Sequence, residues 1–187
     1  MATRFLIAVL AIAVGTGIIQ TALTETREER AIQEAQGHLA WAQLEEARDV
    51  LSDALEDVPN SARLRDERSK VFASLARWRG DAVAGEAAII EKGLAVAANP
   101  LHSGRWGEYA LLLQENGRPT AAIAAVQRGL ERDPNNLYLL AVLGQSQLVA
   151  GQPQEAVRTL ERAQRIQSSA AVRDLLAQAN EALETAE

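Results

Sequence analysis

The 187-residue sequence contains no cysteine, which excludes disulfide bonds and thiolate metal sites. Aromatic residues make up only 4% of the chain, and runs of β-branched residues are few. Acidic residues outnumber basic ones, so the formal net charge is −6 and the pI is about 5.1. Nucleic-acid-binding proteins normally present a basic surface, so this charge argues against a nucleic-acid partner. The alanine-rich remainder predicts an all-α fold.

The sequence also lacks a constellation of catalytic or metal-ligating residues. Its two histidines, His38 and His102, lie far apart and have no neighbouring ligand pattern. Adjacent carboxylates such as Glu45 and Glu46 point to different sides of a helix. No glycine-rich phosphate loop follows a strand, because no strand is evident. We therefore expect no enzymatic activity, no cofactor and no metal site.

The longest uncharged run lies at the N-terminus, where residues 5–24 separate Arg4 from Glu25. Twenty residues at ~1.5 Å each would span a hydrocarbon core of ~30 Å. A cleaved signal peptide has a similar start, but neither Gly15–Gly17 nor Gln20–Ala22 makes a good cleavage site. We therefore expect residues 1–24 to be a retained membrane anchor. A cleaved signal peptide is the main alternative, and a buried core helix is a third one.

The charges that flank this run give little information on orientation, because Arg4 precedes it while Arg27 and Arg30 follow it. A short N-terminal tail before a larger domain favours a cytoplasmic N-terminus and an extracytoplasmic domain. In a bacterium, the chain would then be a single-pass inner-membrane protein with its domain in the periplasm.

One pattern is written twice between Ser103 and Ala170. Gly117 and Gly151 are 34 residues apart, and the same spacing separates Pro119 from Pro153 and Ala122 from Ala156. Each copy follows a helical apolar pattern and precedes another. A period of this length with a turn signal in the middle indicates a helix–turn–helix repeat array. Small residues at fixed places let neighbouring helices approach closely, while large ones fill the space between them.

This pattern resembles the tetratricopeptide repeat (TPR), whose period is about 34 residues. Trp106, Tyr109 and Ala110 take the family's first-helix places, and Ala122, Gly129 and Pro134 take its second-helix places. The resemblance implies a right-handed α-solenoid of about three to four helical hairpins. The expected repeats cover residues 28–61, 62–102, 103–136 and 137–170, of which the second is degenerate. An amphipathic helix over residues 171–186 is expected to cap the array.

The first and second repeats depart from the pattern. Ala42 stands where the later copies have the turn glycine, so we expect a less sharp turn there. Residues 62–79 read as one long helix with Val71, Phe72, Leu75 and Trp78 on its apolar side. Gly80 and Asp81 then look like a helix stop followed by a helix start.

Two surfaces are candidates for binding. The first is the concave groove, which first helices line in TPR proteins, and by this resemblance it presents Leu111, Tyr138, Ala141, Val142, Gln145, Leu148 and Val149. The alternative interpretation is that the C-terminal helix covers this patch. The second is a basic stretch that could meet an acidic partner or lipid headgroups, or could be a solvated face: Arg63, Arg65, Arg68, Lys70, Arg77 and Arg79.

The resemblance implies a protein that holds other proteins. The subclass that clamps a C-terminal carboxylate needs basic groove residues, and the matching places here hold none, among them Ile32, Gly107 and Gln145. We expect a non-catalytic, membrane-tethered TPR scaffold, acting as an assembly factor or accessory subunit of a membrane complex. The alternatives are a structural subunit whose membrane helix packs in such a complex, and a secreted or periplasmic TPR binding protein released after signal cleavage.

Overall fold

The computed structural model describes residues 24–185, and every regular element in that range is an α-helix. The expected anchor therefore lies outside the described residues, apart from Thr24. Within the described range, no helix combines the length and the hydropathy that crossing a bilayer requires.

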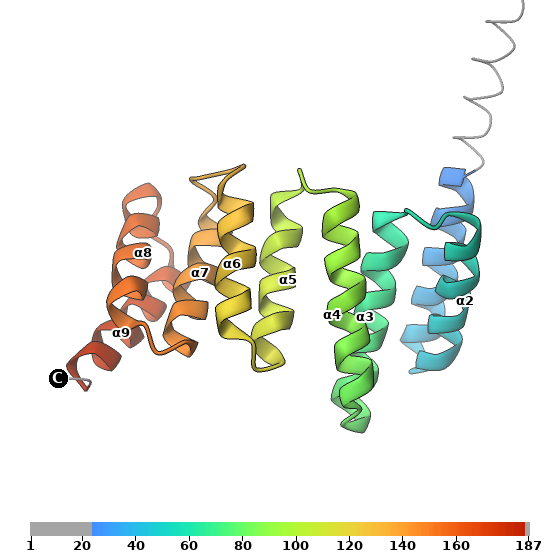
Figure 1. Cartoon of the computed structure of the whole chain (residues 1–187), viewed down its shortest axis with the longest axis horizontal. Helices are drawn as coiled ribbons and strands as arrows, with labels where there is room; N and C mark the ends of the chain where they lie inside the picture. Colours follow the sequence, from blue (N-terminus) through green and yellow to red (C-terminus); the bar gives the residue numbers. More distant parts are fainter. Residues whose placement is uncertain (1–23, 186–187) are drawn as a thin grey trace, which may run out of the picture.

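The helices follow one another as antiparallel neighbours. A first helix over residues 24–40 is followed by α2 (Leu44–Asp57), α3 (Ala62–Arg79), α4 (Ala82–Ala98), α5 (Ser103–Glu115), α6 (Pro119–Leu130), α7 (Leu137–Val149), α8 (Pro153–Ile166) and α9 (Ala170–Glu184). Successive pairs form hairpins that stack side by side, and α9 packs on α7 and α8 at the C-terminal end (Figure 1). The expected all-α solenoid is confirmed over these residues.

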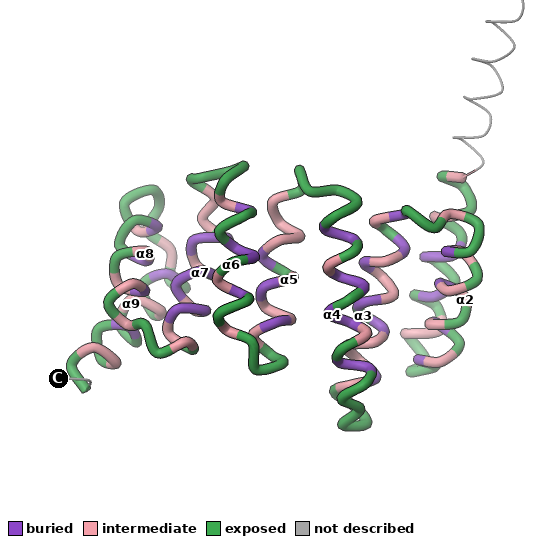
Figure 2. Tube along the Cα trace, in the orientation of Figure 1, coloured by how far each residue is buried: buried purple, intermediate pink, exposed green. Residues whose placement is uncertain are grey.

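Small residues sit where the sequence pattern places them, at the closest contacts between helices. Ala110, Ala122 and Ala156 are fully buried. A Cβ on Gly144 would lie 2.6 Å from Leu160 Cγ, which is far inside van der Waals contact. Along each helix, buried positions alternate with exposed ones (Figure 2). The stack is therefore held by alternating small and large apolar side chains.

The helix ends also follow from local sequence. The Ser61, Asp81 and Asn136 side chains each accept a hydrogen bond from a backbone N–H in the first turn of the helix that follows. Gly80 ends α3 in the left-handed conformation, with φ 66°, as its place before Asp81 predicted.

The turn at Ala42 differs from expectation. Ala42 has φ 58°, close to the φ of 72° at Gly117 and Gly151, so the turn is the same in spite of the missing glycine. The Gln43 N–H donates to the His38 carbonyl at 3.0 Å. Each of the two glycine turns has a backbone hydrogen bond between the same relative positions. The expected looser turn is therefore wrong, because the two flanking helices and this hydrogen bond hold an alanine in a conformation that favours glycine.

Replacing Ala42 by glycine is expected to stabilise the fold by about 1 kcal/mol. An L-residue in the left-handed region costs roughly 1–2 kcal/mol, and glycine removes this strain. Glycine also has a larger conformational entropy in the unfolded state, which reduces the gain by roughly 0.5–1 kcal/mol. Urea unfolding of the full chain measures the change. Ala40→Gly is the matched control, because this residue is exposed and helical, and it should lose about 0.5–1 kcal/mol. Equal losses in both variants would contradict the strain at Ala42.

Candidate protein-binding surface

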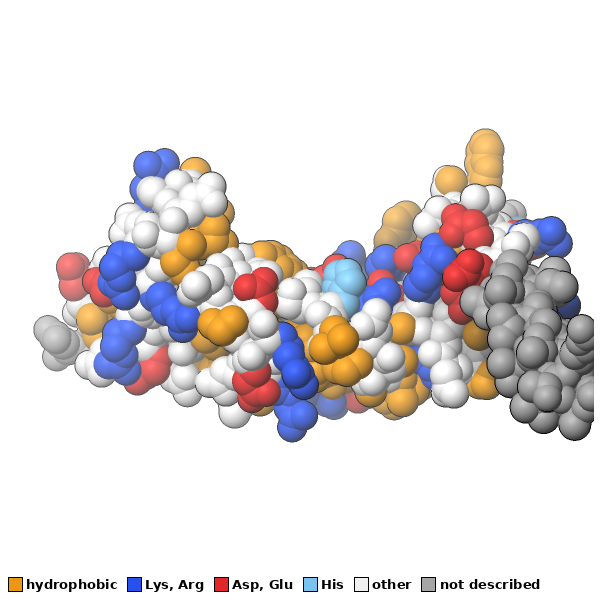
Figure 3. All heavy atoms as spheres, turned by 90° about the horizontal axis from the view of Figure 1, so that it is seen from above, with side chains coloured by type: hydrophobic (Ala, Val, Ile, Leu, Met, Phe, Trp, Pro, Cys, Tyr) orange, Lys and Arg blue, Asp and Glu red, His pale blue; other side chains and the backbone are white. Residues whose placement is uncertain are grey.

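The stacked hairpins leave the molecule hollowed along one side. Figure 3 shows the hollow along the upper edge of the molecule, between two raised ends. In Figure 1, α2, α4, α6 and α8 lie toward the viewer, and the opposite side of the molecule becomes the upper edge in Figure 3. The first helices of the hairpins therefore lie on the side of the hollow. The residues expected in the groove belong to two of these first helices, α5 and α7.

Two of the expected groove residues are well exposed: Tyr138 has 42% of its surface accessible and Val149 has 55%. Leu111, Ala141 and Gln145 are only partly buried. Leu111 is partly buried against the core cluster shared by α4, α5, α6 and α7. These side chains leave an accessible surface that is narrower than the sequence predicted.

Val142 lies in the core instead of the groove. It is only 4% exposed and packs in the same cluster as Leu113, Val126 and Leu139. The sequence could not separate these cases, because α7 is apolar on all sides and its pattern marks no outer face. A partner in the groove therefore cannot contact the Val142 side chain.

The C-terminal helix covers part of the patch. Leu148 packs against the cluster that joins α8 to Ala179 of α9, and Ala141 packs against the cluster that contains Val172 of α9. Tyr138 and Val149 remain open at opposite ends of α7. The alternative interpretation therefore holds for Leu148 and Ala141, whereas Tyr138 and Val149 stay accessible.

Tyr138 is held in place by the neighbouring repeat. A Cβ on Gly107 would lie 2.4 Å from Tyr138 Cε1, so the tyrosine ring lies on the bare backbone of α5. Partial burial raises the pKa of the Tyr138 hydroxyl, and the negative charge of Glu108 adds a smaller effect in the same direction. The residue therefore presents a fixed aromatic ring and a neutral hydroxyl at physiological pH.

Trp78 is an exposed aromatic residue that the sequence analysis missed. It was expected on the apolar side of α3, but it is 74% exposed, while Val71 and Leu75 are buried. Trp78 precedes the left-handed residue Gly80 by two positions, just as Val149 precedes Gly151. The two side chains thus occupy equivalent places at the ends of α3 and α7. The spacing to the turn glycine was the signal that could have placed Trp78 outside the core.

The expected basic patch is compensated by acidic side chains. Glu91 of α4 binds Arg65 at 3.2 Å and Arg68 at 2.6 Å, and Glu67 binds Lys70 at 2.7 Å. The other pairs are Arg63–Glu29 at 2.6 Å, Arg77–Glu115 at 3.3 Å and Arg79–Glu45. The hydrogen bond from Arg63 lowers the pKa of Glu29. The six cations therefore link α3 to four other helices or to its own turns, and they do not form an uncompensated basic surface.

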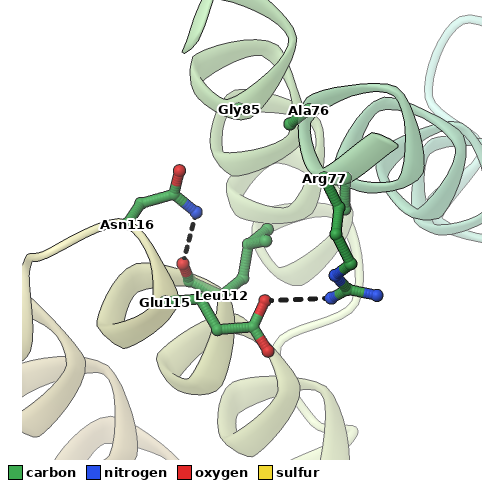
Figure 4. Close-up of a pocket in the computed structure, with 7 residues that line it drawn as sticks. Ala76, Arg77, Gly85, Leu112, Glu115 and Asn116 are labelled. Carbon is green, nitrogen blue, oxygen red and sulfur yellow. Dashed lines mark hydrogen bonds and ion pairs between the residues drawn. The ribbon is translucent and has the colours of Figure 1, made fainter. Parts of the chain in front are cut away.

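A pocket of about 370 Å³ lies where α3 turns into α4 and α5 ends. Figure 4 shows Arg77 paired with Glu115, and Asn116 bonded through its side-chain amide to the Leu112 carbonyl at 2.8 Å. A Cβ on Gly85 would lie 2.8 Å from Asn116 Oδ1, so a larger residue there would require the Asn116 side chain to shift. The pocket carries both signs of charge and could receive a polar side chain. Among residues 24–185, no group of three or more acidic or histidine side chains is placed to hold a metal ion.

The stacked hairpins define a helical repeat protein with one hollowed side. A sequence model of the tetratricopeptide repeat matches residues 113–179. No curated protein sequence matches the chain significantly. This match indicates tetratricopeptide repeats in the C-terminal part of the chain, and proteins built from such repeats typically act as non-catalytic protein-interaction scaffolds.

Similar solved structures extend the fold comparison to most of the chain. A tetratricopeptide repeat protein from Parabacteroides merdae has a TM-score of 0.71 at 16% identity, covering 86% of this chain and 61% of that one. The Pseudomonas aeruginosa protein pilF has a TM-score of 0.64 at 21% identity, covering 86% and 75%. A thermophilic TPR protein of Thermus thermophilus has a TM-score of 0.57 at 16% identity, covering 83% and 82%. At these identities the likeness is one of fold.

Proposed function

We propose that this chain is a membrane-tethered, non-catalytic scaffold that holds a segment of a partner protein in its hollow face. It would serve as an assembly factor or accessory subunit of a larger membrane complex, with its repeats on the extracytoplasmic side. The observation that carries the proposal is the exposure of Trp78, Tyr138 and Val149 on the first helices of their hairpins.

The energetic argument is that these side chains gain most from a partner. An exposed valine or aromatic residue forgoes on the order of 1.5–3 kcal/mol relative to full burial. Tyr138 is already positioned by Gly107, so binding would cost little further ordering of its side chain. Large, pre-ordered aromatic residues are the usual anchors of protein interfaces.

The chemistry between these anchors suggests the form of the partner segment. Glu115 occupies the place on α5 that Trp78 and Val149 occupy on α3 and α7, and it is paired with Arg77. A partner segment would therefore meet apolar contacts at two ends and a polar region between them. An extended peptide or an amphipathic helix with a polar middle fits this order.

The uncharged run over residues 5–24 supports the membrane tether. A tether confines the repeats to the neighbourhood of other membrane components, which raises the effective concentration of a partner without any added contact. Mass spectrometry of the full protein purified from membranes would test retention of the run. An N-terminus after Gly17 or Ala22 would mean that the segment is cleaved.

Tyr138→Glu and Val149→Glu are expected to remove the partner while leaving the fold intact. A carboxylate at either exposed position would be desolvated in the complex but stays in water in the free protein. The measurement is affinity purification of tagged full-length variants in mild detergent, with quantitative mass spectrometry of the co-purifying proteins.

Ile166→Glu is the matched control, because Ile166 is as exposed as Tyr138 but lies at the end of α8. The proposal requires proteins that are lost, by roughly tenfold or more, with the groove variants and kept with the control. The same set of proteins in all three samples would rule out this groove as the binding site.

A further inference from the structure

The outer side of α4 carries an apolar stripe that no other described part of the chain covers. Its positions follow the 4-3-4-3 spacing of a coiled-coil seam: Val83, Ala87, Ile90, Leu94 and Ala97. Ile90 is 58% exposed, and Val83 and Leu94 are also exposed. Leu101, in the loop after the helix, is 73% exposed. A contiguous stripe of this kind on a globular surface usually marks an interaction site.

The two flanks of the stripe differ. Toward α3, the flank is polar and satisfied, because Glu91 is bound by Arg65 and Arg68. Toward α6, an open apolar pocket of about 320 Å³ begins at Gly93 and Ala97 of α4 and continues to Trp106 and Ala124. Any helix that packs on the stripe would therefore gain more by leaning toward α6.

We propose that this surface binds a second copy of the same chain, with the two α4 helices antiparallel. A two-fold axis across the helices keeps the α6 flank of one copy against the α6 flank of the other, so the two pockets face a common apolar seam. A parallel arrangement would instead set each pocket against the polar flank. The antiparallel pairing alone matches like surface with like.

The charges at the ends of the seam fit the same arrangement. Glu86 lies on the α6 flank near the start of α4, and its side chain is 52% exposed although Arg118 binds it. Arg128 lines the pocket near the end of α4, and no acidic side chain pairs with it among residues 24–185. An axis near residue 92 sets Ile90 opposite Leu94 of the second copy and brings Glu86 level with the second copy's Arg128. Each end of the interface then joins opposite charges.

The size of the surface sets the strength of the dimer. A helix of 17 residues is about 25 Å long and ~10 Å wide, so α4 offers a footprint of about 250 Å². Standard stable interfaces bury about 800 Å² per partner, and the exposed alanines of α6 supply only part of the difference. The dimer is therefore reversible, with a dissociation constant of roughly 1–100 μM.

The test is the molar mass of the full chain in mild detergent, measured by light scattering over a range from about 1 to 300 μM, which brackets that constant. The wild-type mass should rise from monomer to dimer with concentration. Ile90→Glu should weaken association about 30-fold or more, because it buries a carboxylate at the seam. Arg128→Glu and Glu86→Arg should each weaken it about fivefold, and the double exchange should restore most of the loss.

Val149→Glu is the matched control, since Val149 is as exposed as Ile90 but lies on α7, and it should leave association unchanged. Ala124→Arg blocks the pocket without touching α4 and provides the answer if Ile90→Glu folds poorly by circular dichroism. A monomer at every concentration overturns the proposal. A dimer that neither Ile90→Glu nor Ala124→Arg weakens overturns it as well, because the contact would lie elsewhere.

Discussion

Replacing Lys92 by methionine is expected to lower the free energy of unfolding by about 3–5 kcal/mol, the usual cost of removing one partner of a buried ion pair. The Lys92 side chain is only 5% exposed, and its ammonium group contacts carboxylates of Asp66 on α3 and Glu108 on α5. Methionine has a similar shape and length but no charge. Asp66 would then stay buried with only Lys70, at 3.4 Å, as a directly paired cation.

The large effect follows from the place of Lys92 in the stack. One apolar cluster extends from the first helix to Ala84 of α4, and the next extends from Ile89 of α4 into α7. Through its ion pairs, Lys92 of α4 links α3, which contributes to the first cluster, with α5, which contributes to the second. Loss of its charge would loosen the junction between the two halves, while the packing within each half would be kept.

Unfolding in urea or by heat, followed by circular dichroism, measures the loss. Lys70→Met is the matched control, because it makes the same chemical change in an exposed residue paired with the same Asp66, and it should cost less than about 1 kcal/mol. Equal losses in the two variants would show that burial of the Lys92 ion pair does not increase its contribution to the free energy of unfolding.

The pH dependence identifies the cause. Burial acts to raise the pKa of Asp66, but the hydrogen bond and charge of Lys92, with Lys70 and Arg105 nearby, outweigh it and lower the pKa. A lowered pKa contributes stability above the unfolded value of about 3.9, and that contribution is lost as the pH falls through the folded value. The difference between wild type and Lys92→Met should therefore be largest near pH 7 and shrink below about pH 4.

The helices and the solenoid could be predicted because their signals are local. Ser61 and Asp81 cap the helices that they precede, and Gly117 and Gly151 supply left-handed turns 34 residues apart. The small residues of the repeat mark close helix contacts whatever the rest of the chain does. Local chemistry of this kind can be recognised in a single sequence. The fold class could therefore be predicted without knowledge of the tertiary contacts.

The candidate site could be predicted only in part, because exposure depends on distant residues. Arg65 and Arg68 read as a basic stretch until Glu91, more than 20 residues away in sequence, neutralises them. Ala42 reads as a weaker turn until the hairpin around it holds the glycine conformation. Trp78 follows the apolar spacing of Val71 and Leu75 along α3, yet it is 74% exposed in the structure. The pairing and the turn are decided by the second helix of the same hairpin, which a local sequence pattern does not describe.

Val142→Glu is expected to unfold the C-terminal half of the array, with a loss of several kcal/mol in the free energy of unfolding. The Val142 side chain is 4% exposed and packs in an apolar cluster with residues of α5, α6 and α7. A glutamate side chain there must either be buried as a charged group without a partner or become protonated. In both cases the folded state loses free energy relative to the unfolded state, in which the carboxylate is hydrated.

Val149→Glu, seven residues later on the same helix, should change stability by less than about 0.5 kcal/mol, because its carboxylate stays in water. Thermal unfolding of the two variants therefore separates core from accessible groove along α7. A folded Val142→Glu variant with wild-type stability would mean that α7 turns this side chain outward and that the groove extends to this position. Loss of stability in both variants would instead place Val149 in the core, and the binding surface would then reduce to Trp78 and Tyr138.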